Sequence, residues 1–224
     1  MCKIDVQTRI LARNDDTASH NRIHFLERGI FTVNVMGSPG SGKTAVLEAT
    51  ARAFDRRAIA ALAGDLATDN DAARLQRAGI RSRAITTGQA CHLDAELVHH
   101  ELHHLDLSGV DYLFIENVGN LVCPAVYDLG QSANVVALSV TEGEDKPLKY
   151  PTMFAKADLV LITKIDLLPY LGTDLDAIQD ALARVMPNPQ VVLLSAREGY
   201  GIDSWLAWLT KSRDEIFSAA EVMA

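Results

Sequence analysis

Short apolar runs alternate along this chain with segments of helical spacing. The apolar runs are Ile30–Met36, Ala58–Ala63, Ala84–Thr87, Tyr112–Ile115, Val135–Val140, Leu159–Thr163 and Val191–Leu194. The main helical patterns are Thr44–Phe54, Asp71–Ala78, Leu93–Leu105, Leu175–Val185 and Ile202–Leu209. Strands that are apolar throughout are buried on both faces, as in parallel sheets. The alternation therefore predicts an α/β fold, with one mostly parallel sheet and helices on both faces.

The chain shows no linker that separates two domains, so we expect one domain over residues 30–218. Residues 1–29 are polar with helical spacing, which predicts an N-terminal helical extension of one or two helices, broken near Asn14–Thr17. Proline or glycine marks three expected loops, at Thr141–Pro151, Pro169–Asp174 and Met186–Gln190.

Composition excludes several classes of protein. The 224 residues are 48% hydrophobic and 22% charged, as in ordinary globular proteins. No apolar run approaches the ~20 residues that cross a bilayer, and the first residues lack the apolar core of a signal peptide. A net charge of −8 disfavours nucleic acid as a partner. Three cysteines are too few for a disulfide scaffold, so we expect a reducing, cytoplasmic compartment.

A glycine-rich segment, GSPGSGKT at Gly37–Thr44, links the first apolar run to the first of the main helical patterns. It matches G-x-x-x-x-G-K-[ST], whose backbone N–H groups surround phosphate oxygens at the start of a helix. The motif predicts a single P-loop NTPase domain, in which Lys43 bridges the β- and γ-phosphates and Thr44 holds Mg²⁺. The residues expected to bind nucleotide here are Gly37, Ser38, Gly40, Ser41, Gly42, Lys43, Thr44 and Ala45.

Two acidic residues follow apolar runs and are candidates for the Mg²⁺ environment. Glu116 begins the segment Glu116–Gly119, which resembles the DxxG switch of GTPases, and Gly119 is expected to direct its N–H at the γ-phosphate. An ordinary surface turn is the alternative. Asp65 lies in the oxygen-rich segment Gly64–Asp71, whose end also fits a helix N-cap near Asn70-Asp71. We expect Mg²⁺ at Thr44, Asp65 and Glu116, and catalytic roles for Asp65, Lys43 and Glu116.

The segment TKID at Thr163–Asp166 resembles the NKxD motif that recognises guanine. The Asp166 carboxylate can accept from guanine N1–H and N2–H₂, a donor pair that adenine lacks, and the Lys164 stem can cover the base. Ser195-Ala196 resembles the SAx loop that contacts guanine O6. An ordinary strand end is the alternative for TKID alone, but its order and spacing after the P-loop favour guanine.

Two cysteines and a histidine have side chains suited to Zn²⁺ or Ni²⁺. Cys91-His92 precedes a helical pattern, and Cys123 follows the Glu116–Gly119 segment. Three ligands leave a coordination position open for water, a partner or a metal in transit. Two buried free thiols are the alternative, because such thiols are common in protein cores. Spacing alone leaves both interpretations open.

The helical pattern that begins near Cys91-His92 carries further histidines. Four side chains, of His92, Glu96, His99 and His103, fall within roughly 60° of one helical face. A solvated polar face is the favoured interpretation, and an auxiliary weak metal site is the alternative. Cys2 is a single thiol and a weak candidate.

Together these segments resemble the HypB family of nickel-incorporation GTPases in [NiFe]-hydrogenase maturation, part of the SIMIBI class of P-loop GTPases. The resemblance covers most of residues 25–210. The matching stretches are GSPGSGKT at Gly37–Thr44, GDLATDNDAAR at Gly64–Arg74, TTGQACHLDA at Thr86–Ala95, IENVGNLVCPA at Ile115–Ala125, EGEDKPLKYP at Glu142–Pro151 and TKIDLLP at Thr163–Pro169.

The resemblance implies hydrolysis of GTP to GDP and a nucleotide-dependent homodimer. It also implies Ni²⁺ or Zn²⁺ bound near the dimer interface by Cys91, His92 and Cys123. The implied partners are a small nickel-binding zinc chaperone and the hydrogenase large subunit. Asn120 stands where a glutamine would position the attacking water, so we expect slow intrinsic hydrolysis. Many members carry an N-terminal CxxCGC motif or a His-rich stretch; this chain has only Cys2, so we do not expect nickel storage.

Three other functions fit parts of the pattern. A urease-type nickel accessory GTPase would carry a Cys-Pro-His metal motif, whereas here Cys91-His92 and Cys123-Pro124 are separate. A metal-binding or storage protein with a vestigial nucleotide site is disfavoured by the intact P-loop. A P-loop kinase acting on a small molecule would not need the guanine motif.

Overall fold

The computed structural model describes residues 3–88 and 90–223. Its strands form one sheet in the order β3-β2-β4-β1-β5-β6-β7, and all their pairings are parallel. The strands are β1 Phe31–Met36, β2 Ile59–Asp65, β3 Arg81–Thr86, β4 Tyr112–Glu116, β5 Ala133–Ser139, β6 Leu159–Thr163 and β7 Val191–Leu194. The α-helices are α1 Lys3–Glu27, α2 Lys43–Ala53, α3 Asn70–Arg77, α4 Ala95–Leu102, α5 Lys146–Lys149, α6 Pro151–Ala155, α7 Leu175–Val185 and α8 Ile202–Met223.

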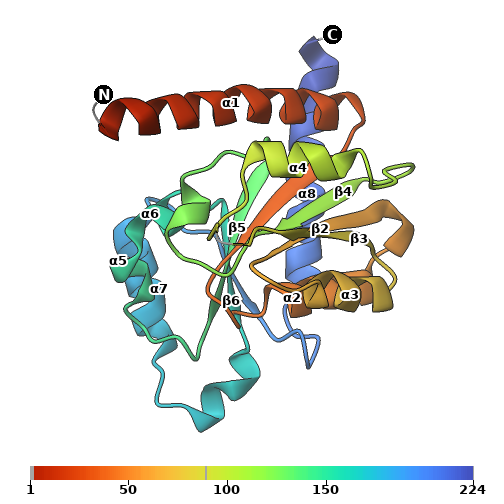
Figure 1. Cartoon of the computed structure of the whole chain (residues 1–224). Coiled ribbons are helices and arrows are strands. Elements are labelled where there is room, and N and C mark those ends of the chain that lie inside the picture. Colours follow the sequence, from red (N-terminus) through yellow and green to blue (C-terminus); the bar gives the residue numbers. More distant parts are fainter. Residues whose placement is uncertain (1–2, 89, 224) are drawn as a thin grey trace.

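Helices cover both faces of the sheet, as predicted (Figure 1). On one face α2, α3 and α8 pack over the strands, with Phe114 and the fully buried Trp205 in the shared core. On the other face α4 packs over β2 and β4, and α6 and α7 pack over β5 and β6. Most of the strands are largely apolar because alternate residues serve the two cores; β3, at the edge of the sheet, is the exception. Among the described helices, none has both the length and the apolarity of a transmembrane span.

The N-terminal segment is a single helix, so the expected break at Asn14–Thr17 is wrong. Asn14 does not cap a helix end, because its amide spans to other segments. Its Oδ1 accepts from Ala95 N at 2.9 Å and its Nδ2 donates to Asp128 O at 2.8 Å. Asn21, two turns further along the same face of α1, is fully buried and donates to Ala95 O and Leu129 O. These two asparagines therefore attach α1 to Ala95 and to Asp128-Leu129 and do not end the helix.

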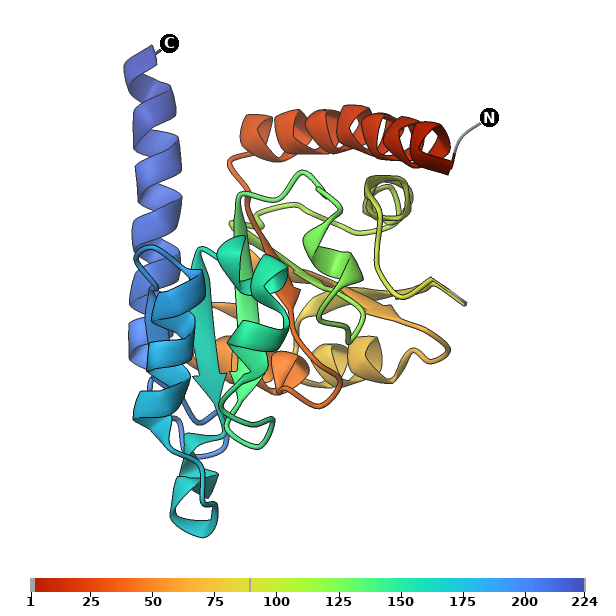
Figure 2. The same ribbon diagram turned by 90° about the vertical axis from the view of Figure 1, so that its left-hand side faces the viewer.

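Several element boundaries also differ from the sequence-based expectation. β3 begins at Arg81 rather than Ala84, because in this edge strand only Ser82 and Ile85 are buried and its first residues are polar. The expected helix Leu93–Leu105 is shorter, since Asp94 caps α4 through Leu97 N. The expected loop Thr141–Pro151 contains α5. α8 continues to Met223 beyond the expected end at Leu209; its continuation extends past the sheet beside the end of α1 (Figure 2).

The strand order puts β1 between β4 and β5, where the direction of the connections reverses. In parallel sheets, the crevice outside the carboxyl ends of the strands at this point is the usual ligand site. The P-loop follows β1, the Glu116 segment follows β4 and the TKID segment follows β6. The topology therefore brings the three predicted nucleotide motifs to one edge of the sheet.

Candidate nucleotide and metal sites

The P-loop lines a cavity of about 460 Å³ at the carboxyl edge of the sheet. Gly37, Gly40 and Gly42 have φ of 146°, 74° and 98°, which only glycine adopts readily. A side chain at Gly37 would overlap the carbonyl oxygen of Ala137. This strained path folds the loop into a nest of the kind that binds phosphate.

Lys43 is the first residue of α2, and its ammonium group is held inside the loop. It is 7% exposed, and its Nζ donates to Gly37 O at 3.3 Å and to Ser38 O at 3.2 Å. Burial lowers the pKa of Lys43, while Glu116 and other nearby carboxylates counteract that shift. The cation is thus positioned where it can exchange carbonyl partners for phosphate oxygens.

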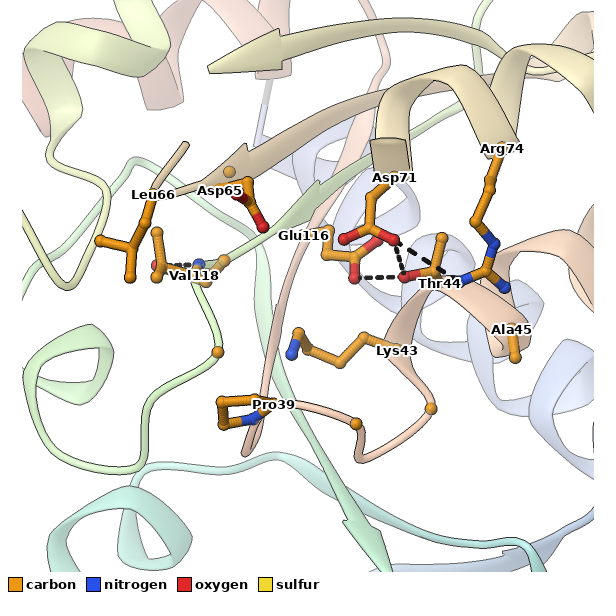
Figure 3. Close-up of a pocket in the computed structure, with 15 residues that line it drawn as sticks. Pro39, Lys43, Thr44, Ala45, Asp65, Leu66, Asp71, Arg74, Glu116 and Val118 are labelled. Atoms are coloured by element: carbon orange, nitrogen blue, oxygen red, sulfur yellow. Dashed lines mark hydrogen bonds and ion pairs between the residues drawn. The ribbon is translucent and has the colours of Figure 1, made fainter. Parts of the chain in front are cut away.

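Three oxygen-bearing side chains converge on the wall opposite Lys43 (Figure 3). Thr44 Oγ1 lies 2.8 Å from Glu116 Oε1 and 2.9 Å from Asp71 Oδ1. The single hydroxyl proton can serve one of these carboxylates at a time. Within the described residues, Glu116 Oε2 and Ser41 Oγ are buried without a hydrogen-bond partner. A buried oxygen without a partner in an acidic cluster fits a hard cation such as Mg²⁺.

Asp65 lines the same cavity, but its carboxylate is occupied locally. Its Oδ1 accepts from Ala67 N and Thr68 N, both at 2.9 Å, and these bonds lower the pKa of Asp65. The sequence interpretation placed Asp65 beside Thr44 and treated Asp71 as a capping residue; in the structure Asp71 makes the Thr44 contact. Asp71 is also held by Arg74, which pairs with Glu48 at 2.8 Å.

Burial raises the pKa of Glu116 to about 7, although Lys43 and the Thr44 hydrogen bond oppose the shift. In nucleotide-free and metal-free protein, the folded state therefore holds a proton that the unfolded chain releases at its pKa of 4.5. The resulting stabilisation is complete below that pH and is lost as pH rises through 7, by about 3 kcal/mol. Urea unfolding of wild type and Glu116→Gln from about pH 4.5 to 8 tests this. The free energy of unfolding of wild type minus that of Glu116→Gln should fall as pH rises. A difference that does not depend on pH contradicts the prediction.

The Glu116–Gly119 segment packs directly against the P-loop. A Cβ on Gly119 would lie 2.9 Å from Pro39 Cα, so only glycine permits the approach. Asn120 N donates to Gly37 O at 3.1 Å, and Asn120 Oδ1 accepts from Val122 N at 2.8 Å. These contacts join the P-loop, through Asn120, to the turn that leads to Cys123.

Of the expected guanine residues, Lys164 contacts the P-loop, and Asp166 contacts Ser195. Lys164, in the left-handed region at φ 58°, donates from Nζ to Gly40 O at 2.7 Å. Thr163 Oγ1 donates to Ser41 O at 2.6 Å, so the threonine that replaces the usual asparagine supports the loop. Ser195 Oγ donates to Asp166 Oδ1 at 2.7 Å. Ala196 O accepts from Arg52 at 3.1 Å.

Cys91, His92 and Cys123 come together beside this cavity. Their ligand atoms all lie within 4.8 Å of one another, and the two Sγ atoms are 2.8 Å apart. The His92 ring stacks on Tyr127 at a centroid distance of 3.9 Å. Burial lowers the pKa of His92, which favours the neutral, ligating imidazole. The hydrogen bond from Cys91 and burial raise the pKa of Cys123, so a metal binding here must displace a proton.

The expected helical face of His92, Glu96, His99 and His103 is only partly correct. His92 precedes α4 and belongs to the cysteine cluster. Glu96 pairs with Arg13 of α1 at 3.2 Å. Only His99 and His103 lie together, with their Nε2 atoms 3.4 Å apart.

Sequence patterns missed three residues that hold these sites together. Asn117 Oδ1 accepts from Leu93 N at 3.1 Å, and Asn117 Nδ2 donates to Asn34 Oδ1. Glu142 Oε2 accepts from Ser38 Oγ of the P-loop. Tyr127, whose ring stacks on His92, belongs to no recognised sequence motif. The stretches IENVGN and EGEDKP pointed to Asn117 and Glu142 as parts of motifs without indicating these contacts.

Comparison with known proteins agrees with this arrangement. Residues 31–193 match a family model described as CobW/HypB/UreG, nucleotide-binding domain. The hydrogenase maturation factor HypB of Azotobacter vinelandii is 49% identical over 209 residues, which cover 93% of this chain and 69% of the relative. The hydrogenase/urease maturation factor HypB of Helicobacter hepaticus is 45% identical, over 87% of this chain and 82% of the relative.

A crystal structure of Helicobacter pylori HypB in complex with nickel superposes with a TM-score of 0.88 at 38% identity, covering 92% of this chain and 97% of that one. The fold and the cavity thus define a P-loop nucleotide-binding protein of the CobW/HypB/UreG class. Within that class, the chain belongs to the HypB family of hydrogenase maturation factors.

Proposed function

We propose that this protein hydrolyses GTP and uses the cycle to control Ni²⁺ at Cys91, His92 and Cys123, for delivery to a [NiFe]-hydrogenase. One observation carries the proposal. The Glu116–Gly119 segment touches the P-loop at Pro39, and Asn117 of the same segment accepts from Leu93 N, next to His92. The segment then continues to Cys123. A change at the phosphates is therefore transmitted to both metal-bearing loops.

The nucleotide chemistry is assigned to residues of the cavity. Lys43 and the P-loop N–H groups bind the β- and γ-phosphates, and Gly119 N–H contacts the γ-phosphate. Thr44, Glu116 and Asp65 provide the Mg²⁺ environment, with Asp71 added because it contacts Thr44. When bound, Mg²⁺ neutralises charge that develops on the phosphates. Asn120 already holds the turn before Cys123, which supports a slow intrinsic rate.

Guanine is the proposed base. Asp166 accepts from its N1–H and N2–H₂, Lys164 covers the ring, and Ser195-Ala196 contacts O6. Ser195 Oγ orients the Asp166 carboxylate through the 2.7 Å hydrogen bond, which supports this role.

Asp166→Asn changes the base preference. The amide can donate to a carbonyl at position 2, so the variant should lose GTP affinity by at least about tenfold and gain affinity for xanthosine triphosphate. Competition of labelled GDP by GTP, XTP and ATP measures the change. An unaltered order of affinities overturns the assignment of Asp166.

The metal is proposed to be exchangeable cargo. Three side chains supply two thiolates and one imidazole, which leaves a position for water or for an incoming ligand. The set accepts Zn²⁺ as well as Ni²⁺. Residues 30–218 form the proposed GTPase domain, to which α1 is an extension.

A nucleotide-dependent homodimer is proposed for the face that carries both sites. Three large apolar side chains there are exposed, namely Leu66 at 44%, Val122 at 55% and Val126 at 41%. Leu66 directly follows Asp65, Val122 directly precedes Cys123 and Val126 lies three residues after it, so closure of a dimer over them would enclose the nucleotide and the metal. The other proposed partners are a small nickel-binding zinc chaperone, as donor, and the hydrogenase large subunit, as recipient.

Titration of the full chain with Ni²⁺, once with GDP and once with a non-hydrolysable GTP analogue, tests the proposal. Because coupling is reciprocal, the two nickel affinities should differ, and bound nickel should shift nucleotide affinity by the same factor. Light scattering on the same samples reports the oligomeric state. Equal affinities in both nucleotide states would refute the coupling.

Other functions give different results in the same assays. A storage protein with a vestigial nucleotide site binds metal but hydrolyses no GTP. A P-loop kinase transfers phosphate to a small acceptor. A urease-type accessory protein restores urease rather than hydrogenase when it is supplied to maturation-deficient cells.

A further inference from the structure

We propose a second transition-metal site, at which the Nε2 atoms of His99 and His103 chelate one divalent ion. His99 lies in α4, and His103 follows it one turn later as the helix C-cap. The rings meet edge to face with a centroid separation of 4.9 Å. Residues four apart on a helix share a face, which is how paired histidines bind zinc elsewhere.

The separation of the two nitrogens matches a metal chelate. The Nε2 atoms are 3.4 Å apart. Two imidazole nitrogens at ~2.1 Å from a tetrahedral ion lie about 3.4 Å from each other. Both Nε2 atoms can therefore bind one ion without any rearrangement of the backbone.

The buried amide of Asn21 fixes the tautomer of His99. Asn21 Nδ2 donates to the carbonyls of Ala95 and Leu129, so the amide oxygen is assigned as the acceptor. That oxygen lies 2.9 Å from His99 Nδ1, which must then carry the proton. With its proton on Nδ1, His99 directs Nε2 toward His103. A hydrogen bond that orients the far nitrogen is typical of metal-ligating histidines.

A cavity of about 280 Å³ adjoins the pair and gives an ion room for water ligands. His24 of α1 lines it, and burial together with the charge of Arg28 lowers the pKa of His24. Asp106 lines the same cavity and pairs with Arg81 at 3.4 Å. Among the described residues only Cys91, His92 and Cys123 already form a three-ligand set, so water completes the coordination at His99 and His103.

The ligand chemistry selects borderline ions such as Zn²⁺, Ni²⁺ and Cu²⁺ over Mg²⁺ and Ca²⁺. Two neutral imidazoles and no thiolate make this site weaker than the cysteine cluster. The site does not depend on nucleotide, so it can be tested apart from the proposed GTPase cycle.

The chain offers a matched control in the neighbouring pair His100 and His104. These rings have the same four-residue spacing, but their centroids are 5.3 Å apart and the planes are tilted by 57°. His100 Nδ1 lies 3.2 Å from Glu101, and no buried amide orients either ring among the contacts described. If spacing alone created metal affinity, both pairs would bind equally well.

The experiment measures Zn²⁺ binding by competition with a chromophoric chelator. Full-length Cys91→Ser/Cys123→Ser protein removes the thiolate site and should retain one equivalent of bound Zn²⁺. Adding His103→Gln should weaken that binding at least about tenfold. Adding His100→Gln and His104→Gln instead should leave it unchanged. Cu²⁺ electron paramagnetic resonance should show two imidazole nitrogens, reduced to one by His103→Gln.

The results separate this site from its alternatives. Zn²⁺ affinity that survives His103→Gln, or that falls only with the His100 and His104 changes, overturns the proposal. Should the double cysteine variant fail to fold, the same comparison is made with intact cysteines. The stoichiometry should then fall from two equivalents to one in His99→Gln/His103→Gln; an unchanged value overturns the proposal.

Discussion

Lys43→Ala is expected to lower kcat for GTP hydrolysis by about 10² to 10³-fold. The Lys43 ammonium is the cation held inside the P-loop, bonded to the carbonyls of Gly37 and Ser38 and 7% exposed. Phosphate oxygens take over those bonds when nucleotide binds, and a charge in this sheltered site acts strongly on the negative charge that develops there. Nucleotide affinity should fall as well, since the same interaction exists in the ground state.

Single-turnover hydrolysis of GTP with Mg²⁺ present measures the effect. Lys211→Ala is the matched control, because this exposed lysine of α8 pairs with Glu215 in a surface contact of 3.7 Å. Retained Zn²⁺ binding at the cysteine cluster shows that Lys43→Ala is folded. A folded variant that hydrolyses GTP within threefold of wild type would exclude Lys43 from the catalytic residues.

Cys123→Ala is expected to weaken Ni²⁺ binding at the cysteine cluster at least about 100-fold. One of the two thiolates is lost, and the remaining Cys91 and His92 are adjacent in sequence and constrain each other's approach to an ion. Alanine keeps the small apolar volume beside Pro124, so the turn Cys123–Ala125 is preserved. Metal-free GTP hydrolysis should remain close to wild type, whereas the dependence of nickel affinity on nucleotide should disappear.

Nickel titration with GDP and with the GTP analogue measures both effects. Cys2→Ala is the control, because it removes a thiol and leaves residues 91, 92 and 123 intact. Unchanged metal affinity and unchanged coupling in Cys123→Ala would mean that the metal reaches the nucleotide cycle by another route.

Much of the nucleotide site was predictable from the sequence because its geometry is local. The P-loop needs glycine at positive φ directly after a strand and lysine at the start of a helix, and all of this lies within eight consecutive residues. The role of Asp71 was not predicted, because the sequence around Asn70-Asp71 also fits a helix N-cap. Its contact with Thr44 spans 27 residues and depends on how α3 packs beside α2.

In the N-terminal helix the local sequence predicts a break that the structure does not contain. The local pattern at Asn14 predicts a break because polar residues such as Asn and Asp favour turns and caps. Its amide instead spans Ala95 N and Asp128 O, more than 80 residues away in both cases. Local propensity contains no information about such partners, so tertiary contacts override it.

The sequence by itself determined the parallel α/β fold, the phosphate loop and the position of the TKID segment after β6, because each depends on short-range backbone geometry and on the repeat of apolar residues. Only the tertiary structure decided which side chains meet. The Sγ atoms of Cys91 and Cys123 lie together although 32 residues separate them in sequence. They meet because Asn117, directly after β4, accepts a hydrogen bond from Leu93 N. His99 is oriented by Asn21 across 78 residues because α1 packs on α4. Such meetings depend on strand order and helix packing, which the whole chain settles together.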